Sequence, residues 1–540
     1  MKFFNTEGPV NKESHYKIDP LSRWDMDEIL TLIAREKYFI LHAPRQTGKT
    51  SCLLALRDYL NKEERYYCVY ANFEAAQTAR NDISEGIKSI LSELHQRAIG
   101  ALKIKIPFTV NEIIEKNGAN KAMGTYLSAL CELLDKPLIL LIDEIDSLIG
   151  DTLVSVLRQL RASYDTRPDA FPQSVILCGV RDIKDYRIHK SDDDIITGGS
   201  CFNIKAKSLT LGNFSDDEVK TLYAEHTKET GQIFEPDCFP LIMRYTGGQP
   251  WLVNALGYEV TYEMKPNRDP SVVIAPEMIE TAKERLILSR ATHLDQLSDK
   301  LQEDRVRRVI EPMIVGEEDN STKDDNQYCI DLGLVKLSPQ GLIISNEIYM
   351  EIIPRELTEI RQTRFLSRFT PEWVKQDESL DTEKLFTMFQ EFWRENSEIW
   401  KKDMAGYREA APHLTFQAFL QRVANGKGFI GREFAYGTKR SDLVLKWKYP
   451  AGEPDRNPAG TGKQAGEQRI VIELKMLKEK DSYDAIKTKA LEQTAMYADK
   501  CNATEAHIII FDRCRKTDWK EKIFTDTGER NGYHIKIWGM

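Results

Sequence analysis

Five polar residues near the C-terminal end of the chain stand in an order that suits chemistry on a phosphodiester. They are Asp442, Glu473, Lys475, Gln493 and Tyr497. Hydrolysis of a phosphodiester needs one or two divalent ions held by carboxylates, together with a group that helps to form hydroxide. We therefore take this set as a candidate metal site in which Asp442 and Glu473 are the ligands.

The local pattern around Glu473 predicts how these side chains come together. Residues 469–475 are largely apolar and end in Glu-Leu-Lys, which predicts a strand with Glu473 and Lys475 on the same face. Asp442 opens a second predicted strand, and an antiparallel pairing of the two would bring it beside Glu473. Burying Glu and Lys on an apolar strand costs free energy unless they pair or bind a metal, which favours a functional site.

Further residues join this set from both sides. A helix is expected from Tyr483 to Lys500, and Gln493 and Tyr497, four residues apart, share one of its faces. Glu433 lies nine residues before Asp442 and could add a further carboxylate. The stretch 450–468 is rich in Gly, Pro and polar residues, which predicts a long loop between the two strands.

A second phosphate site is indicated near the N-terminus. Residues 42–50 follow a predicted buried strand and have the form G-x-x-x-x-G-K-[ST], with Ala43 in place of the first glycine. Backbone N–H groups of such a loop cradle phosphates, the lysine reaches the terminal phosphates and the hydroxyl holds Mg²⁺. The expected nucleotide-binding residues of the loop are Arg45, Gln46, Thr47, Gly48, Lys49 and Thr50.

The acidic partner of this loop is expected at the end of a buried strand, residues 137–143. Asp143 would hold Mg²⁺ together with Thr50, and the adjacent Glu144 could orient the attacking water as a catalytic residue. Hydrolysis also depends on an arginine that stabilises charge. The candidates are Arg158, Arg161 and Arg181, and the sequence does not choose among them.

Strands that alternate with helices up to about residue 205 predict an α/β fold with a parallel sheet. The pattern is helical after about residue 206, where Ser215 and Glu218 have the spacing of a capping box. Helices followed by two short strands around the turn at 338–341 predict a winged helix. Strands return after residue 428 and are expected at 429–434, 442–449, 469–475, 506–512 and 533–538.

Length and composition bound these interpretations. A chain of 540 residues is too long for one core, and three or four domains are expected. The net charge of −9 argues against a non-specific nucleic-acid coat, although residues 401–450 hold ten basic and four acidic residues. Nine scattered cysteines without a C-x-x-C pair favour a reducing cytosol, and no apolar run approaches the roughly 20 residues of a membrane span. The N-terminus lacks a signal-peptide pattern, so we expect a cytoplasmic protein without a membrane partner.

The N-terminal motifs resemble those of the bacterial and archaeal ATPases of the STAND/AAA+ kind. The resemblance covers residues 20–357 and rests on three further matches: the Asp-Glu pair, the Cys-Gly-Val-Arg-Asp after the fourth strand, and the Gly-Gly-Gln-Pro-Trp that starts at Gly247. It implies a P-loop NTPase parallel sheet with a helical lid and a winged helix. It also implies ATP as the cofactor, with Gly248 and Pro250 near the nucleotide.

The C-terminal set resembles the PD-(D/E)xK nuclease superfamily, most of all its RecB-like branch, over about residues 415–540. The resemblance implies an α/β restriction-endonuclease-like domain. It makes Asp442 and Glu473 the ligands of Mg²⁺ or Mn²⁺, Lys475 the group that positions hydroxide, and Glu433 an auxiliary acid. Gln493 and Tyr497 would line the site. Ser441 replaces the proline that often precedes the first acid.

Together these patterns predict five segments. They are an ATPase core at 1–205, a lid at 206–295, a winged helix at 296–357, a helical linker at 358–414 and a nuclease-like domain at 415–540. The expected function is cleavage of DNA by a metal-dependent endonuclease under control of ATP. Three questions stay open: whether the substrate is RNA, whether the ATPase domain forms a homo-oligomer, and whether the chain is instead a signalling or scaffold ATPase whose nuclease-like domain only binds nucleic acid or a partner.

Overall fold

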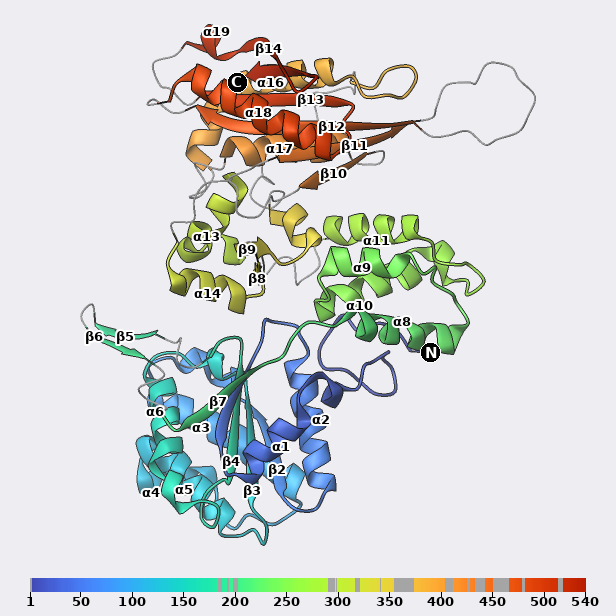
Figure 1. Cartoon of the computed structure of the whole chain (residues 1–540). Helices are drawn as coiled ribbons and strands as arrows, with labels where there is room; N and C mark the ends of the chain where they lie inside the picture. The colour runs from blue at the N-terminus through green and yellow to red at the C-terminus, as the bar shows by residue number, and fades with distance from the viewer. Residues whose placement is uncertain are drawn as a thin grey trace. The chain divides into compact units, whose positions relative to one another are not determined.

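A computed structural model gives the fold (Figure 1). It describes residues 2–182, 187–191, 194–197, 203–289, 297, 299–315, 321–339, 341–353, 373–403, 411–424, 428–432, 442–449, 466–477, 481–512 and 518–540. The chain divides into two compact units. The first comprises Met1–His293, Asp331–Leu334 and Asn346–Ile348, and the second comprises the remainder. The five-segment division stays a prediction.

The first unit is built on a five-stranded parallel sheet. Its strands are β1 (Tyr38–His42), β2 (Tyr67–Asn72), β3 (Leu138–Asp143), β4 (Ser174–Gly179) and β7 (Lys205–Thr210). They lie in the order β2-β3-β4-β1-β7, and all neighbours run parallel. The carboxyl ends of β1, β3 and β4 therefore meet at one edge of the sheet, which is where ligands bind in open α/β sheets.

Helices cover both faces of this sheet (Figure 1). Residues of β1 alternate between two cores: Phe39 and Leu41 pack with α1 (Met26–Ala34) and α2 (Lys49–Lys62), whereas Tyr38 and Ile40 face the other side. That second core is filled by four helices, which are α3 (Ile83–Leu102), α4 (Val110–Asn117), α5 (Ala119–Cys131) and α6 (Asp151–Ala162). The near-continuous apolar runs of the inner strands reflect this burial on both faces.

The edge strand β7 corrects the sequence-based prediction that helices begin after residue 206. The stretch Lys205–Thr210 alternates polar and apolar residues, and most of its side chains are half-buried or exposed. An edge strand needs no apolar run, so periodicity gave no signal for it. The hairpin of β5 (Arg187–Ser191) and β6 (Asp194–Thr197) was likewise not predicted.

Four helices follow β7 in the first unit: α8 (Asp216–Thr230), α9 (Cys238–Thr246), α10 (Pro250–Tyr258) and α11 (Pro276–Leu288). The predicted capping box of α8 is confirmed, because Ser215 Oγ accepts from the Glu218 amide at 3.3 Å and Glu218 accepts from the Ser215 amide at 2.7 Å. Residues 2–19 form an N-terminal strap against these helices. Phe4 lies fully buried in it, and the Trp251 indole donates to the Thr6 carbonyl at 2.8 Å.

Two helices and a two-stranded hairpin follow α11 along the described part of the chain. Helices α13 (Asp304–Val315) and α14 (Lys323–Asp331) precede an antiparallel hairpin of β8 (Val335–Ser338) and β9 (Gly341–Ile344). This order of elements agrees with the predicted helices and paired strands. The shorter helical turns are Pro20–Arg23, Glu74–Ala79, Ile145–Ser147, Tyr164–Thr166, Glu259–Glu263 and Lys265–Arg268.

The second unit carries a mixed six-stranded sheet. Its strands are β10 (Gly428–Arg432), β11 (Asp442–Tyr449), β12 (Gly466–Leu477), β13 (Glu505–Asp512), β14 (Phe524–Arg530) and β15 (Tyr533–Gly539), in the order β10-β11-β12-β13-β15-β14. The antiparallel pairing of β11 with β12 is confirmed. Strand β14 was not predicted. Residues 450–465 of the predicted long loop lie outside the described residues, and its last three belong to β12.

Helices lie on both faces of this sheet as well. On one face α18 (Tyr483–Lys500) packs Ala490 and Ala498 against Ile508 and Ile537. On the other face lie α16 (Thr382–Asp403) and α17 (Ala411–Ala424), and Trp393 of α16 has its ring centroid 5.1 Å from that of Phe511. A short helix, α19 (Trp519–Lys522), precedes β14.

Candidate functional site

The phosphate loop lies between the end of β1 at His42 and the start of α2 at Lys49. Gly48 has a φ of +91°, which favours glycine, and it begins a helix of 14 residues that has no side-chain cap. The first N–H groups of α2 are therefore not used by a capping side chain and can bind phosphate oxygens. The loop occupies the position that the sequence motif predicts.

Lys49 lies within this loop and is 6% exposed. Its Nζ donates to the carbonyl oxygens of Ala43 and Pro44, each at 2.9 Å. Thr47 is fully buried, and its Oγ1 donates to the Pro44 carbonyl at 2.8 Å. Arg45 and Gln46 are exposed, and Gln46 has a φ of +56°. The lysine charge thus lies where the loop would receive terminal phosphates.

Asp143 and Thr50 come together at the carboxyl edge of the sheet. Thr50 Oγ1 donates to Asp143 Oδ2 at 2.7 Å, and the fully buried carboxylate also accepts from the Tyr70 hydroxyl at 3.0 Å and from the Glu144 amide at 3.0 Å. A hydroxyl and one carboxylate, completed by phosphate oxygens and water, suit Mg²⁺. Tyr70, which lies on β2, was not predicted as part of this site.

Glu144 follows Asp143 with a φ of +53°. Burial, followed by the charge of Asp146, raises the pKa of Glu144 to about 7, while Lys49 acts in the opposite direction. A carboxyl whose pKa lies near neutral pH is suited to accept a proton from an attacking water. The role of Glu144 in orienting the attacking water stays a prediction.

The three candidate arginines differ in their surroundings. Arg158 and Arg161 lie exposed on α6. Arg181 is 9% exposed, and its Nε lies 3.2 Å from Asp331 Oδ2 in an ion pair. A different arginine, Arg23, was not predicted, and its Nη1 donates to the Thr47 carbonyl of the loop at 2.5 Å. No motif marks Arg23, because it lies 24 residues before its partner in the chain.

The second candidate site lies on β11, β12 and α18. Asp442 stands directly opposite Glu473 in the antiparallel register. Glu473 is fully buried, and Lys475 Nζ pairs with its carboxylate and donates to Gln493 Oε1 at 2.9 Å. Tyr497 is 2% exposed and packs against Val471. Glu433 lies outside the described residues, as does the side chain of Asp442.

The donors of this second set suit a hard divalent cation. Carboxylate oxygens are the ligands that Mg²⁺ and Mn²⁺ prefer, and Glu473 supplies two of them in a buried position. Among the described side chains, no group of three or more His, Cys, Asp or Glu residues is placed to hold a metal ion. A cation would therefore need oxygens from water or substrate in addition to these carboxylates.

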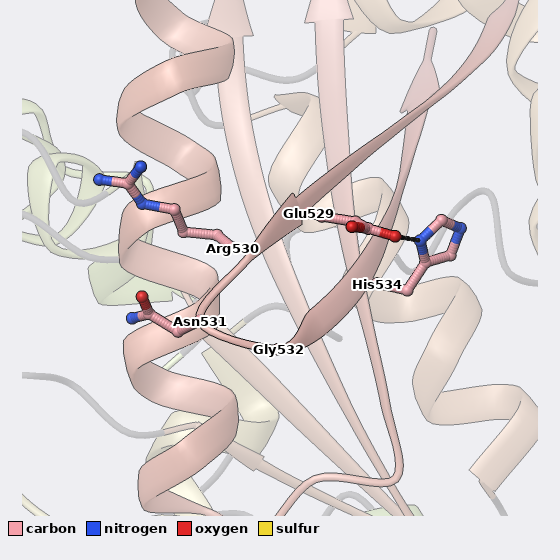
Figure 2. A pocket seen from close by; sticks show the side chains of 5 residues that line it. All are labelled: Glu529, Arg530, Asn531, Gly532 and His534. Atoms are coloured by element: carbon pink, nitrogen blue, oxygen red, sulfur yellow. Dashed lines mark hydrogen bonds and ion pairs between the residues drawn. The ribbon is translucent and has the colours of Figure 1, made fainter.

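A hollow of about 450 Å³ lies at the turn between β14 and β15. Figure 2 shows that Glu529 and His534 point toward each other, whereas Arg530 and Asn531 project to the other side. Glu529 Oε1 lies 3.2 Å from His534 Nδ1, and both side chains are more than half exposed. Solvent screens such an exposed ion pair. Strands β13 and β15 separate β14 from β12, so this hollow is not part of the Glu473 site.

The described helices include none that is long and apolar enough to cross a membrane.

Comparison with known proteins places the similarity in the first two thirds of the chain. The AAA-like domain family matches residues 6–354. No curated protein matches the chain. Similar solved structures include a Walker-type ATPase of Pyrococcus abyssi, with 16% identity, a TM-score of 0.43, and coverage of 65% of this chain and 99% of that one. Cdc6p of Pyrobaculum aerophilum has 17% identity, a TM-score of 0.36, and coverage of 65% and 97%.

A third similar structure is the RuvB Holliday junction branch migration motor of Thermotoga maritima. It has 13% identity and a TM-score of 0.32, and the match covers 60% of this chain and 90% of that one.

Proposed function

We propose that this chain, which belongs to the AAA-like domain family, hydrolyses ATP in its first unit. We further propose that this ATPase activity controls a metal-dependent nuclease in the second unit. The first half of the proposal extends a P-loop ATPase fold that binds ATP. The second half rests on one observation: Asp442 stands opposite Glu473 while Lys475 contacts both Glu473 and Gln493.

In the ATPase unit, each residue of the loop has a part in binding or chemistry. The N–H groups at the start of α2 and the Lys49 ammonium bind the phosphates, and Thr50 and Asp143 hold Mg²⁺. Bound Mg²⁺ supplies positive charge that offsets the charge of the phosphates. Glu144 orients the attacking water and accepts its proton, a role that its pKa of about 7 favours.

In the nuclease unit, the protein holds its reacting groups before substrate arrives. A divalent cation held by Asp442 and Glu473 supplies the charge that polarises the scissile phosphate. Lys475 is fixed between Glu473 and Gln493, and its ammonium can steady the charge that develops on phosphate oxygens. Tyr497 holds α18 against β12 from within the core. DNA is the proposed substrate.

Cleavage of plasmid DNA by the purified full-length chain tests the nuclease. With Mg²⁺ or Mn²⁺ we expect cleavage that EDTA abolishes, and Lys475→Ala should slow it by at least about 100-fold, since one charge-stabilising donor is worth that much. The same variant should keep the ATPase rate. Lys489→Ala is the matched control, because Lys489 is an exposed lysine on α18. An unaltered nicking rate in Lys475→Ala would sink the assignment.

The same cleavage assays with RNA, together with DNA-binding measurements, distinguish the two remaining alternatives: an RNA substrate and a scaffold ATPase. Cleavage of RNA but not of DNA would keep the metal chemistry and change the substrate. Binding of DNA by the wild-type chain without cleavage under either metal would favour the scaffold ATPase, in which the nuclease-like domain only binds.

A further inference from the structure

The phosphate loop has an outer side that also needs hydrogen-bond partners. A loop that turns its N–H groups toward an anion turns carbonyl oxygens outward, and buried carbonyls are costly without donors. Thr47 is fully buried, and its carbonyl accepts from Arg23 Nη1 at 2.5 Å. Arg23 therefore supplies a donor to a buried carbonyl of the loop.

The same guanidinium reaches a second segment, which we call the hinge segment, residues 211–214, between β7 and α8. Arg23 Nη2 donates to the Gly212 carbonyl at 2.7 Å, and its Cζ lies 4.7 Å from the centroid of the Phe214 ring. One side chain thus bridges the phosphate loop and the start of the helices that follow β7.

The hinge segment is in turn bonded to the turn before α10. The Phe214 amide donates to the Gly248 carbonyl at 2.8 Å, and Asn213 Nδ2 donates to the Gly247 carbonyl at 3.0 Å. Gln249, in the same turn, also contacts the phosphate loop. Its Nε2 lies 3.4 Å from the Arg45 carbonyl oxygen and 3.5 Å from the Gln46 carbonyl oxygen. These last contacts are long for hydrogen bonds, so Arg23 is the stronger of the two links.

Arg23 is held in place by its own surroundings. It ends the helical turn Pro20–Arg23, which Asp19 caps by accepting from the Leu21 amide at 3.1 Å. Cys52 Sγ of α2 donates to the Pro20 carbonyl at 3.3 Å, which fixes this turn against the helix that carries Lys49. The fit is close, because a Cβ at Gly48 would lie 2.8 Å from Arg23 Nη1.

We propose that Arg23 is a positioning residue that couples the phosphate loop to the hinge segment, so that ATP binding at the loop restrains the helices α8 to α10. The proposal rests on the proposed binding of ATP at Lys49. A guanidinium suits this role because its planar fork can donate in two directions at once, whereas an ammonium is a single point charge. Lysine at this position should keep the charge and lose one of the two contacts.

The test compares full-length wild-type protein with Arg23→Lys, Arg23→Ala and the control Arg57→Ala, whose guanidinium pairs with Asp58 on the outer side of α2. Titration with a fluorescent ATP analogue and Mg²⁺ should give a Kd about tenfold higher for Arg23→Ala, since a hydrogen bond to a charged group contributes about that factor. Arg23→Lys should recover most of the affinity, and Arg57→Ala should match the wild type.

Amide hydrogen exchange is then measured at a saturating concentration of the ATP analogue. This measurement distinguishes a loss of coupling from a loss of affinity or of stability. ATP should slow exchange at Phe214 and Gly248 in the wild type and in Arg57→Ala. In Arg23→Lys it should slow exchange in the loop but leave the hinge segment unchanged. Protection of the hinge segment in Arg23→Lys equal to that of the wild type would overturn the coupling. Failure of the wild-type chain to bind the analogue would overturn the proposed ATP site, and the coupling with it.

Discussion

Two fully buried carboxylates, Asp143 and Glu473, mark the two candidate sites, and each is compensated in a different way. Asp143 accepts from two hydroxyls and an amide, which are neutral donors. Glu473 pairs with the cationic Lys475. A buried anion is costly without such partners. The neutral shell leaves the charge of Asp143 available to a cation, whereas a cation at Glu473 would have to share that carboxylate with Lys475.

A buried histidine under the N-terminal strap makes the attachment of the strap depend on pH. His226 is 5% exposed, lies 3.1 Å from the Tyr16 hydroxyl through Nδ1, and contacts Gln232 Oε1 through Nε2 at 2.8 Å. Burial lowers the pKa of His226 below its usual value of 6.5, and the hydrogen bond to Gln232 acts in the opposite direction. The closed strap therefore holds a neutral imidazole where an opened one can take up a proton.

We expect the free energy of strap opening to fall as pH drops below 6.5. Below pH 6.5 the open form binds more protons than the closed form. For one proton, the free energy of strap opening therefore falls by at most about 1.4 kcal/mol per pH unit. Protection factors of the Phe3 and Tyr16 amides, both bonded to backbone carbonyls, measure this between pH 5.5 and 7.5. His226→Asn should flatten the dependence. A variant with the slope of the wild type would assign the effect to another group, such as His15.

The residues of the Glu473 site show how far spacing alone reaches. Alternation along β12 correctly put Glu473 and Lys475 together, because period 2 is a property of any strand. Gln493 and Tyr497 share a helix face as expected, yet only Gln493 meets Lys475, while Tyr497 packs into the core. Residue spacing predicts which face of a helix or strand a side chain lies on, but it does not predict how deeply that side chain is buried. Arg23 and Tyr70 were missed because their partners lie far away in the sequence.

At the scale of elements, the hinge segment and the turn before α10 approach each other closely, backbone to backbone. Gly248 has a φ of +70°, and a Cβ built on it would lie 2.1 Å from the Phe214 carbonyl oxygen. That contact is with backbone, which cannot rotate away as a side chain could. Glycine is required there for both conformation and space.

Gly248→Ala should therefore loosen this junction. Backbone strain of this kind costs about 1–3 kcal/mol, which would lower the midpoint of thermal unfolding of the first unit by about 2–4 °C for each kcal/mol. Gly212→Ala is the matched control, because a Cβ at Gly212 would meet no atom within 4 Å. Calorimetry on the full-length variants measures both, and equal midpoints for the two would contradict the argument.

Elements were predictable where apolar runs or capping signals mark them. The buried strands β3 and β4 are continuous apolar runs, and Ser215 with Glu218 correctly marked the start of α8. The missed strands β7 and β14 are edge strands with half-exposed, largely polar faces. Hydrogen bonds to a neighbouring strand create such elements, and a single sequence carries no record of that neighbour.

At the scale of the whole molecule, control of cleavage by ATP is a statement about coupling free energy. ATP can change the nuclease only if it binds two states of the chain with different affinity. Linkage then requires that DNA change the affinity for ATP by the same factor by which ATP changes the affinity for DNA. The coupling can thus be measured through the binding of either ligand.

Lys49→Ala is the variant that separates coupling from cleavage. It removes the ammonium that the loop offers to phosphate, so we expect loss of ATP binding and loss of any response of plasmid cleavage to ATP, while metal-dependent cleavage itself persists. In the wild type, DNA should shift the Kd for a fluorescent ATP analogue, and ATP should shift the Kd for DNA by an equal factor; Lys49→Ala should show neither shift. Tight ATP binding by this variant would refute the site. Equal Kd values with and without the second ligand in the wild type, together with a cleavage rate that ATP does not change, would show two independent activities in one chain.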